Sequence, residues 1–152
     1  MAKTTTTGVR QYLYATGRRS EAVARVRLYS SPTSKVVMEG TELKKGDIVV
    51  NGKPINEYFR FFASAPLYNK ILVDTDTGGK YIFTVKVRGG GLSGQLDAVV
   101  MGMARTLDKL DREKFHKILR DNEYLTRVAR TRERRKVGNA GKARRKKSSP
   151  KR

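Results

Sequence analysis

The chain has 152 residues, enough for one domain with an appended segment. It carries 34 Lys and Arg against 14 Asp and Glu, so its formal net charge is +20, while 38% of its residues are hydrophobic. A core of ordinary size therefore coexists with a field that attracts polyanions. The lack of cysteine excludes a disulfide framework and a thiolate metal site, and no apolar run approaches the ~20 residues that a membrane helix needs.

The first part of the chain predicts a flexible start and then strands. Residues 1–11 are polar and Thr-rich and lack the apolar stretch of a secretory signal, which favours a cytoplasmic protein with a flexible N-terminus. From Glu21 the residues alternate, with Ala22, Ala24, Val26 and Leu28 on one face of a strand and Val23, Arg25, Arg27 and Tyr29 on the other. A loop over 30–35 and a short strand over 36–38 follow.

The middle of the chain predicts helices alternating with one long strand. Asn51-Gly52 after Ile48-Val49-Val50 is a strong turn signal, because both residues tolerate positive φ. The pattern then predicts a helix start at Pro54, a short helix over 64–72, a turn over 75–79, a strand over 81–88, a glycine turn over 89–91 and an amphipathic helix over 93–110. Asp111 suits the N-cap of a further helix.

The composition changes after Leu125. Residues 127–152 contain thirteen Lys and Arg and a single acid, Glu133, so this segment has a net charge of +12 and the rest of the chain has +8. Such a segment buries too little apolar surface to offset its ordering entropy, and we expect a polyanion to order it. The expected organisation is a globular body over 12–126 and an extended basic tail over 127–152. Fully extended, the tail would span roughly 85 Å.

The glycine run in KVRGGGLSGQLDA lies between a predicted strand and a predicted helix, where backbone N–H groups hold phosphates in some proteins. It lacks the Gly-Lys-Ser/Thr end of a Walker A loop. It is similar to the loop of small-molecule kinases of the galactokinase and homoserine kinase group. The non-catalytic alternative is a tight turn that packs the helix on the sheet and contacts RNA phosphate.

Other catalytic signals are weak. His116, the only histidine, is expected at the solvated surface, and the spacing of Asp74 and Asp76 is explained by turn chemistry better than by metal binding. No nucleophile–base pair is evident, so we expect no enzyme, no catalytic residue, no metal and no cofactor. The aromatic cluster in RFFASAPLY is typical either of a core or of a base-stacking surface.

Five stretches together resemble one known family. They are YATGRRSEAVARVRL (14–28), VNGKPINEYF (50–59), VKVRGGGLSGQLDAVVMGMARTL (85–107), YLTRVARTRERRKVG (124–138) and KARRKKSSPKR (142–152). In this order they resemble the bacterial form of the ninth protein of the small ribosomal subunit, the universal S-nine family. The family's terminal Lys-Arg pair is kept here as Lys151-Arg152.

The resemblance implies an α/β fold, an α+β two-layer sandwich like the second domain of ribosomal protein S five, with a long basic tail. The implied partners are small-subunit rRNA, peptidyl-site tRNA and neighbouring head proteins, with no membrane. Lys151 and Arg152 are the implied tRNA contacts. The expected rRNA contacts are Arg18, Arg19, Arg25, Arg27, Arg88, Gly89, Gly90, Gly91, Arg127, Arg130, Arg132, Arg134, Arg135, Lys136, Lys142, Arg144, Arg145, Lys146 and Lys147.

Two other classes of function stay open at this point. A small nucleotide-dependent kinase with a basic substrate site would bind ATP and Mg²⁺ saturably. A free DNA-compacting protein would bind duplex DNA and structured rRNA with similar affinity.

Overall fold

Five strands form one sheet in a computed structural model that describes residues 12–30, 36–38, 41–60, 65–132 and 134. The strand order is β1-β2-β7-β5-β6. Neighbouring strands are antiparallel except for β5 and β7, which are parallel. The strands of this sheet are β1 (Leu13–Arg19), β2 (Ala22–Tyr29), β5 (Ile48–Val50), β6 (Lys53–Pro54) and β7 (Ile82–Arg88), and a separate pair consists of β3 (Val37–Met38) and β4 (Thr41–Glu42).

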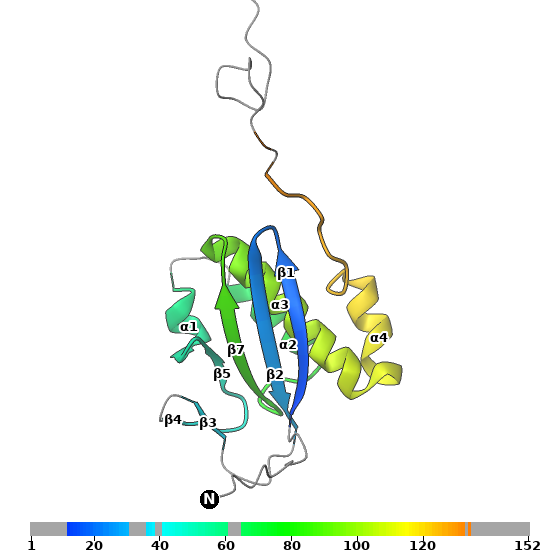
Figure 1. Cartoon of the computed structure of the whole chain (residues 1–152). Helices are drawn as coiled ribbons and strands as arrows, with labels where there is room; N and C mark the ends of the chain where they lie inside the picture. Colours follow the sequence, from blue (N-terminus) through cyan, green and yellow to red (C-terminus); the bar gives the residue numbers. More distant parts are fainter. Residues whose placement is uncertain (1–11, 31–35, 39–40, 61–64, 133, 135–152) are drawn as a thin grey trace, which may run out of the picture.

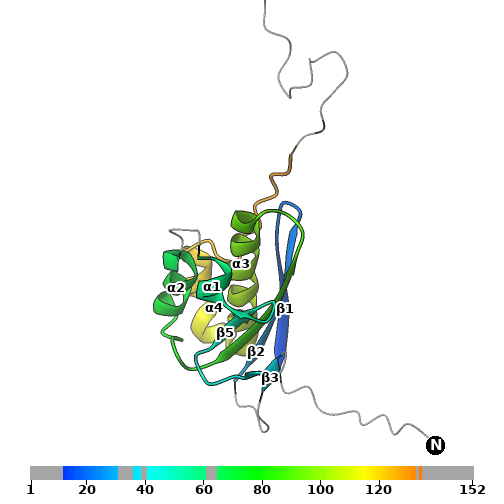
Figure 2. The same ribbon diagram turned by 90° about the vertical axis from the view of Figure 1, so that its left-hand side faces the viewer.

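The helices form a second layer on one side of this sheet (Figures 1 and 2). They are α1 (Ile55–Tyr58), α2 (Ala65–Asp74), α3 (Leu92–Leu110) and α4 (Arg112–Asp121). The long helix α3 packs on β1, β2 and β7, and α2 and α4 pack on α3. The architecture is therefore α+β, and none of the helices in the described part of the chain covers the other face of β1, β2 and β7 (Figure 2).

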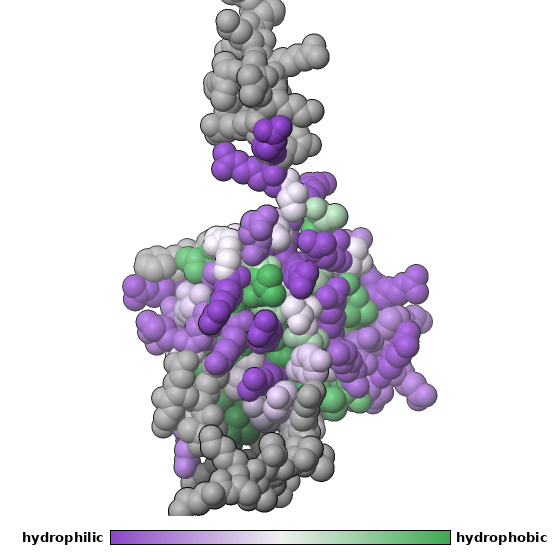
Figure 3. All heavy atoms as spheres, in the orientation of Figure 1, coloured by the Kyte–Doolittle hydropathy of each residue, from purple (hydrophilic) through white to green (hydrophobic). Residues whose placement is uncertain are grey.

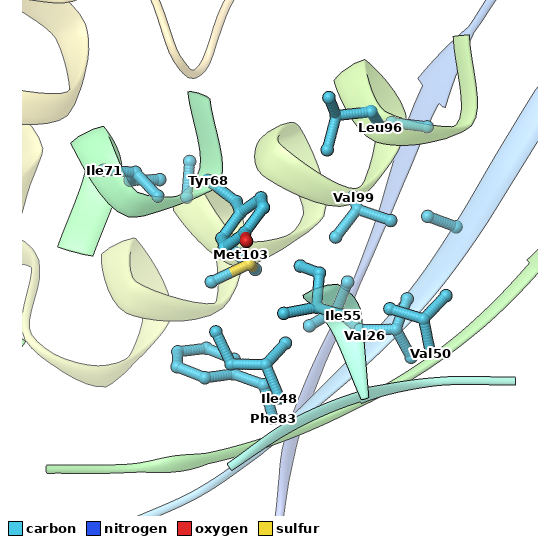
Figure 4. Packing of buried hydrophobic residues seen from close by; sticks show 14 of the residues in the cluster. Val26, Ile48, Val50, Ile55, Tyr68, Ile71, Phe83, Leu96, Val99 and Met103 are labelled. Atoms are coloured by element: carbon cyan, nitrogen blue, oxygen red, sulfur yellow. The ribbon is translucent and has the colours of Figure 1, made fainter. Parts of the chain in front are cut away.

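The core lies between the sheet and the helices. The inward side chains of β2 and β7 meet the apolar stripe of α3, which includes Leu96, Val99 and Met103 (Figure 4). Ile55, Tyr68 and Ile71 close this core from α1 and α2. Burying each large apolar side chain stabilises the fold by about 1.5–3 kcal/mol, so this cluster is the main source of stability.

Glycines let α3 approach the sheet closely. A Cβ added at Gly17 would collide with the carbonyl oxygen of Ala98 and lie 2.6 Å from the backbone N of Gly102. A Cβ at Gly102 would lie 2.5 Å from Cγ2 of Val26. Contacts this short cannot be accommodated without movement of backbone or core, so both positions require glycine.

Two α3 cations cover the outer edge of β1. Arg105 donates to the carbonyl of Thr16 at 2.7 Å, and Lys109 donates to the carbonyl of Tyr14 at 3.0 Å. An edge strand with open carbonyls and amides is a template for unwanted pairing. These bonds occupy part of that edge and tie it to α3.

Most of the predicted elements are confirmed. Asn51 and Gly52 have φ of +48° and +82° and join β5 to β6, and the Asp111 carboxylate caps α4 by accepting from the Lys114 amide. The residue alternation predicted β2 and β7 but gave no separate signal for β1, because Gly17 and Arg19 occupy core-side positions of β1 and Tyr14 an outward one. The flexible start predicted for 1–11 and the loop over 31–35 lie outside the described residues.

Candidate nucleic-acid interface

The helix-free face of β1, β2 and β7 is cationic. Because side chains alternate between faces along a strand, the residues that flank the core-facing positions point to this side. Five of them are exposed cations: Arg18, Arg25, Arg27, Lys86 and Arg88. Hydrophilic side chains run over these strands toward the start of the tail (Figure 3). The structure thus brings together four arginines predicted from the sequence and adds Lys86.

The strand register places like charges directly opposite one another. Arg25 on β2 pairs with Lys86 on β7, and Arg27 and Arg88 lie next to this pair on the same face. None of the three strands contains an Asp or Glu. Directly opposed like charges destabilise a sheet by up to about 1 kcal/mol. An arrangement with this cost and no acidic counterpart in its strands fits an anionic ligand.

Arg19 occupies a different environment from the other predicted arginines. It points to the α3 side of β1, where its Nε lies 3.4 Å from Oδ2 of Asp97. Its guanidinium also donates to the carbonyl of Arg130 at 3.4 Å, and the Ser20 hydroxyl donates to the same oxygen at 3.3 Å. The β1–β2 turn therefore holds the first part of the basic segment against the body.

The glycine turn is tightly packed. Gly89 and Gly90 have φ of +76° and +62°, and a Cβ at Gly89 would collide with the carbonyl oxygen of Glu21. The Gln95 side chain donates to the carbonyl of Gly89 at 3.1 Å, and Gly91 caps α3 without a side-chain hydrogen bond. This geometry supports the reading of the turn as a packing device, with its exposed backbone beside Arg88.

The basic segment begins where α4 ends. Tyr124 donates to Oδ2 of Asp74 at 2.8 Å, and burial together with this bond raises the pKa of Tyr124 to about 12. The chain then leaves the body past the β1–β2 turn (Figure 1). Arg127, Arg130, Arg132 and Arg134 are exposed along this path. The other predicted contacts, Arg135, Lys136, Lys142, Arg144, Arg145, Lys146, Lys147, Lys151 and Arg152, lie outside the described residues.

The predicted aromatic cluster supplies core residues. Phe59 and Tyr68 are buried, and Phe61 and Phe62 lie outside the described part. A second aromatic group was missed, in which Tyr12 and Tyr29 have ring centroids 5.6 Å apart and the Arg27 guanidinium lies over Tyr12. The signal for it was present, since Tyr29 alternates with Arg27 on the face opposite the core.

The residues weighed for catalysis have structural partners instead. His116 is half-buried rather than solvated, and its Nδ1 lies 2.7 Å from Oδ1 of Asp108, which joins α4 to α3. Asp76 is exposed, and its bond to Lys80 holds its pKa below the usual range. It shares no site with Asp74, which binds Tyr124. Within the described ranges, no group of three His, Asp or Glu side chains is placed to hold a metal ion.

The described residues define a small α+β protein with one cationic, helix-free sheet face, a class of surface that attracts polyanions. In the part of the chain that the structure covers, no helix has the length and apolarity to cross a bilayer. A family model described as "Ribosomal protein S9/S16" matches residues 17–152. The chain belongs to this family, which confirms the resemblance drawn from its motifs.

Two relatives show the extent of the similarity. The "Small ribosomal subunit protein uS9" of Dehalococcoides mccartyi (strain CBDB1) is 40% identical over 127 residues, which cover 84% of this chain and 86% of the relative. The protein of the same name from Maridesulfovibrio salexigens is 42% identical over 132 residues, 87% of this chain and 91% of the relative. The match to the family model, over residues 17–152, spans both the body and the basic segment.

Proposed function

We propose that this chain is a structural, non-catalytic protein of the head of the small ribosomal subunit, and that it binds small-subunit rRNA in the cytoplasm. Family membership supports this role, as do relatives named for the small subunit. The observation that carries it is the register of Arg25 against Lys86 on a face whose strands lack acids. Phosphates of folded RNA neutralise this face and remove the repulsion.

Electrostatics provides most of the affinity in this proposal, and the shape of the RNA determines where the protein binds. Arg18, Arg25, Arg27 and Arg88 contact phosphates from the sheet face, with Lys86 as a fifth cation. The exposed backbone of Gly89–Gly91 adds N–H groups beside Arg88, at the end of the sheet where β7 meets α3. Arg19 contributes mainly by holding Arg130 in place, because its guanidinium already binds Asp97.

The basic tail extends the interface away from the body. We infer a globular body over 12–126, of the type found in the second domain of ribosomal protein S five, and an RNA-threading tail over 127–152. Arginine binds phosphate through a planar fork and stacks on bases, which suits the arginines at 127, 130, 132 and 134. Lys151 and Arg152 at the end of the tail contact peptidyl-site tRNA, and neighbouring head proteins are further partners.

Sedimentation tests the assignment directly. The tagged full-length chain, expressed in a bacterium, is expected to sediment with the small ribosomal subunit and to stay there after a wash at moderate salt. Recovery of the chain only in the free-protein fractions, or on the large subunit, would contradict the proposal. Saturable calorimetric binding of ATP with Mg²⁺ would instead support the kinase alternative.

The tail end makes a separate prediction. Removing Lys151 and Arg152 should leave subunit assembly nearly intact and weaken tRNA binding to the peptidyl site, because only the last two charges reach the tRNA. The measurement is filter binding of tRNA to purified subunits that carry the truncated chain. As the matched control, K146Q/K147Q removes the same charge upstream and should weaken rRNA binding instead. Unchanged tRNA affinity in the truncated subunits would refute the contact.

A further inference from the structure

Tyr12, Arg27 and Tyr29 form a group of contacting side chains at one end of the cationic face. The Tyr12 and Tyr29 rings have centroids 5.6 Å apart at an interplanar angle of 52°, and the guanidinium carbon of Arg27 lies 4.8 Å from the Tyr12 centroid. Tyr12 directly precedes β1 and Tyr29 ends β2. Because Leu13 pairs with Leu28, the two tyrosines are cross-strand neighbours on the helix-free face.

An aromatic pair across two strands is often only a packing contact. Two features distinguish this one. Both rings are half-buried while Arg27 is exposed, so the guanidinium is the solvent-side member of the group. Among the described residues Arg27 has no carboxylate partner, so none of their acids competes with a ligand for its N–H groups.

This arrangement prepares Arg27 for stacking. A free arginine side chain loses rotamer freedom when it binds, and that loss costs affinity. Contact with the Tyr12 ring has already restricted Arg27. A guanidinium plane is one of the surfaces on which proteins stack splayed RNA bases. Arg25 and Lys86, next along the same face, are placed to hold the adjoining phosphates.

We propose that an unpaired RNA base stacks on the outer face of Arg27, extending the series Tyr29, Tyr12, Arg27. The site takes a splayed nucleobase from a loop or bulge, and every base suits it because each has a π face. This inference rests on the proposed rRNA-binding function. It adds a contact that depends on the base, whereas the other cations of the face recognise only phosphate.

The test compares two probes of equal length and charge, an oligoadenylate and an abasic oligoribonucleotide, with the full-length chain. Stacking of one base contributes about 1–3 kcal/mol, so wild type should bind oligoadenylate about 5- to 150-fold more tightly than the abasic probe. R27K keeps the charge but loses the plane, and Y12L removes the ring beneath it. Each should reduce this preference about fivefold or more while affinity for the abasic probe stays nearly constant.

The control variants separate stacking from charge and from folding. R25K makes the same exchange on the same strand face, at an arginine that lies opposite Thr16 and Lys86, so the ratio of the two affinities should stay at its wild-type value. Y12F keeps the ring and should also keep the ratio. Thermal unfolding checks that each variant is folded. If Y12L does not fold, the comparison of R27K with R25K alone tests whether a base stacks on Arg27.

Three results would overturn the site: equal affinity of wild type for the two probes, an unchanged ratio in R27K, or an equal loss of preference in R25K. Equal binding of both probes with a steep salt dependence would remove this site and leave the rRNA-binding proposal standing. Failure to bind either probe would contradict both proposals.

Discussion

Asn51 joins two strands through one side chain. Its Oδ1 accepts from the Val87 amide at 2.9 Å, and its Nδ2 donates to the Val87 carbonyl at 3.0 Å. The amide group thus imitates a peptide unit and continues the β5–β7 pairing beyond Val50 and Val85. The sequence predicted the turn at Asn51-Gly52 from the dipeptide alone. It could not predict the bonds to Val87, because that partner is 36 residues away and depends on the parallel pairing of β5 with β7.

Substitutions at Asn51 should separate these bonds from backbone strain. N51G removes the amide but tolerates the φ of +48°, so the free energy of unfolding should fall by about 1–3 kcal/mol. N51A keeps a Cβ in the left-handed region but lacks the amide that lets Asn tolerate it, so it should cost about 1–2 kcal/mol more than N51G. Urea unfolding of the three proteins measures both differences. Equal stability of N51G and wild type would show that the Val87 bonds add nothing.

At the scale of elements, the sequence predicts local periodicity well and long-range contacts poorly. The apolar stripe of α3 and the alternation in β2 and β7 appear in the sequence, because these elements bury one face each. The cationic surface was predicted only in part. Lys86 belongs to the cationic face because β7 pairs with β2. Arg19 does not belong to it, because its side chain faces α3.

The contact of α3 with β1 gives a prediction at this scale. G17A places a methyl group against the backbone of Ala98 and Gly102, so the helix must move off the sheet and the core beneath it must open. Overpacking of this kind costs about 1–3 kcal/mol, and collision with backbone on both sides favours the upper end or beyond. G78A is the matched control, since nothing lies within 4 Å of a Cβ there and Gly78 lies outside the positive-φ glycines.

Chemical denaturation of G17A, G78A and wild type checks this expectation. G78A should match wild type within about 0.5 kcal/mol, as surface substitutions usually do. A G17A protein as stable as G78A would show that α3 and β1 are more loosely packed than the structure indicates.

For the whole molecule, the distribution of charge matters more than its total. Of the net charge of +20, +12 belongs to residues 127–152, and the body contributes a sheet face whose strands lack acids. The start of the basic segment is held on the β1–β2 turn by bonds to the Arg130 carbonyl. The cations of the face and those of the segment therefore meet at one end of the sheet (Figures 1 and 3).

Under the proposed function, this continuity lets the sheet face and the start of the basic segment contact the same RNA. The sequence alone predicted the basic segment and the alternating arginines of β2, because each is a local feature. Their junction depends on a contact between positions 19 and 130, 111 residues apart, and only the structure reveals it.

The salt dependence of rRNA binding tests the central claim most directly. R25Q/K86Q removes the opposed pair of cations, and R112Q/K117Q removes one arginine and one lysine from the exposed surface of α4 as the matched control. Each lost phosphate contact should reduce the slope of log affinity against log salt by about 0.7–0.9. The account predicts a smaller slope by about 1.4–1.8 for R25Q/K86Q on small-subunit rRNA, with no loss of folding stability, and a wild-type slope for R112Q/K117Q. Equal slopes for the two double variants would contradict a role of the sheet face in RNA binding.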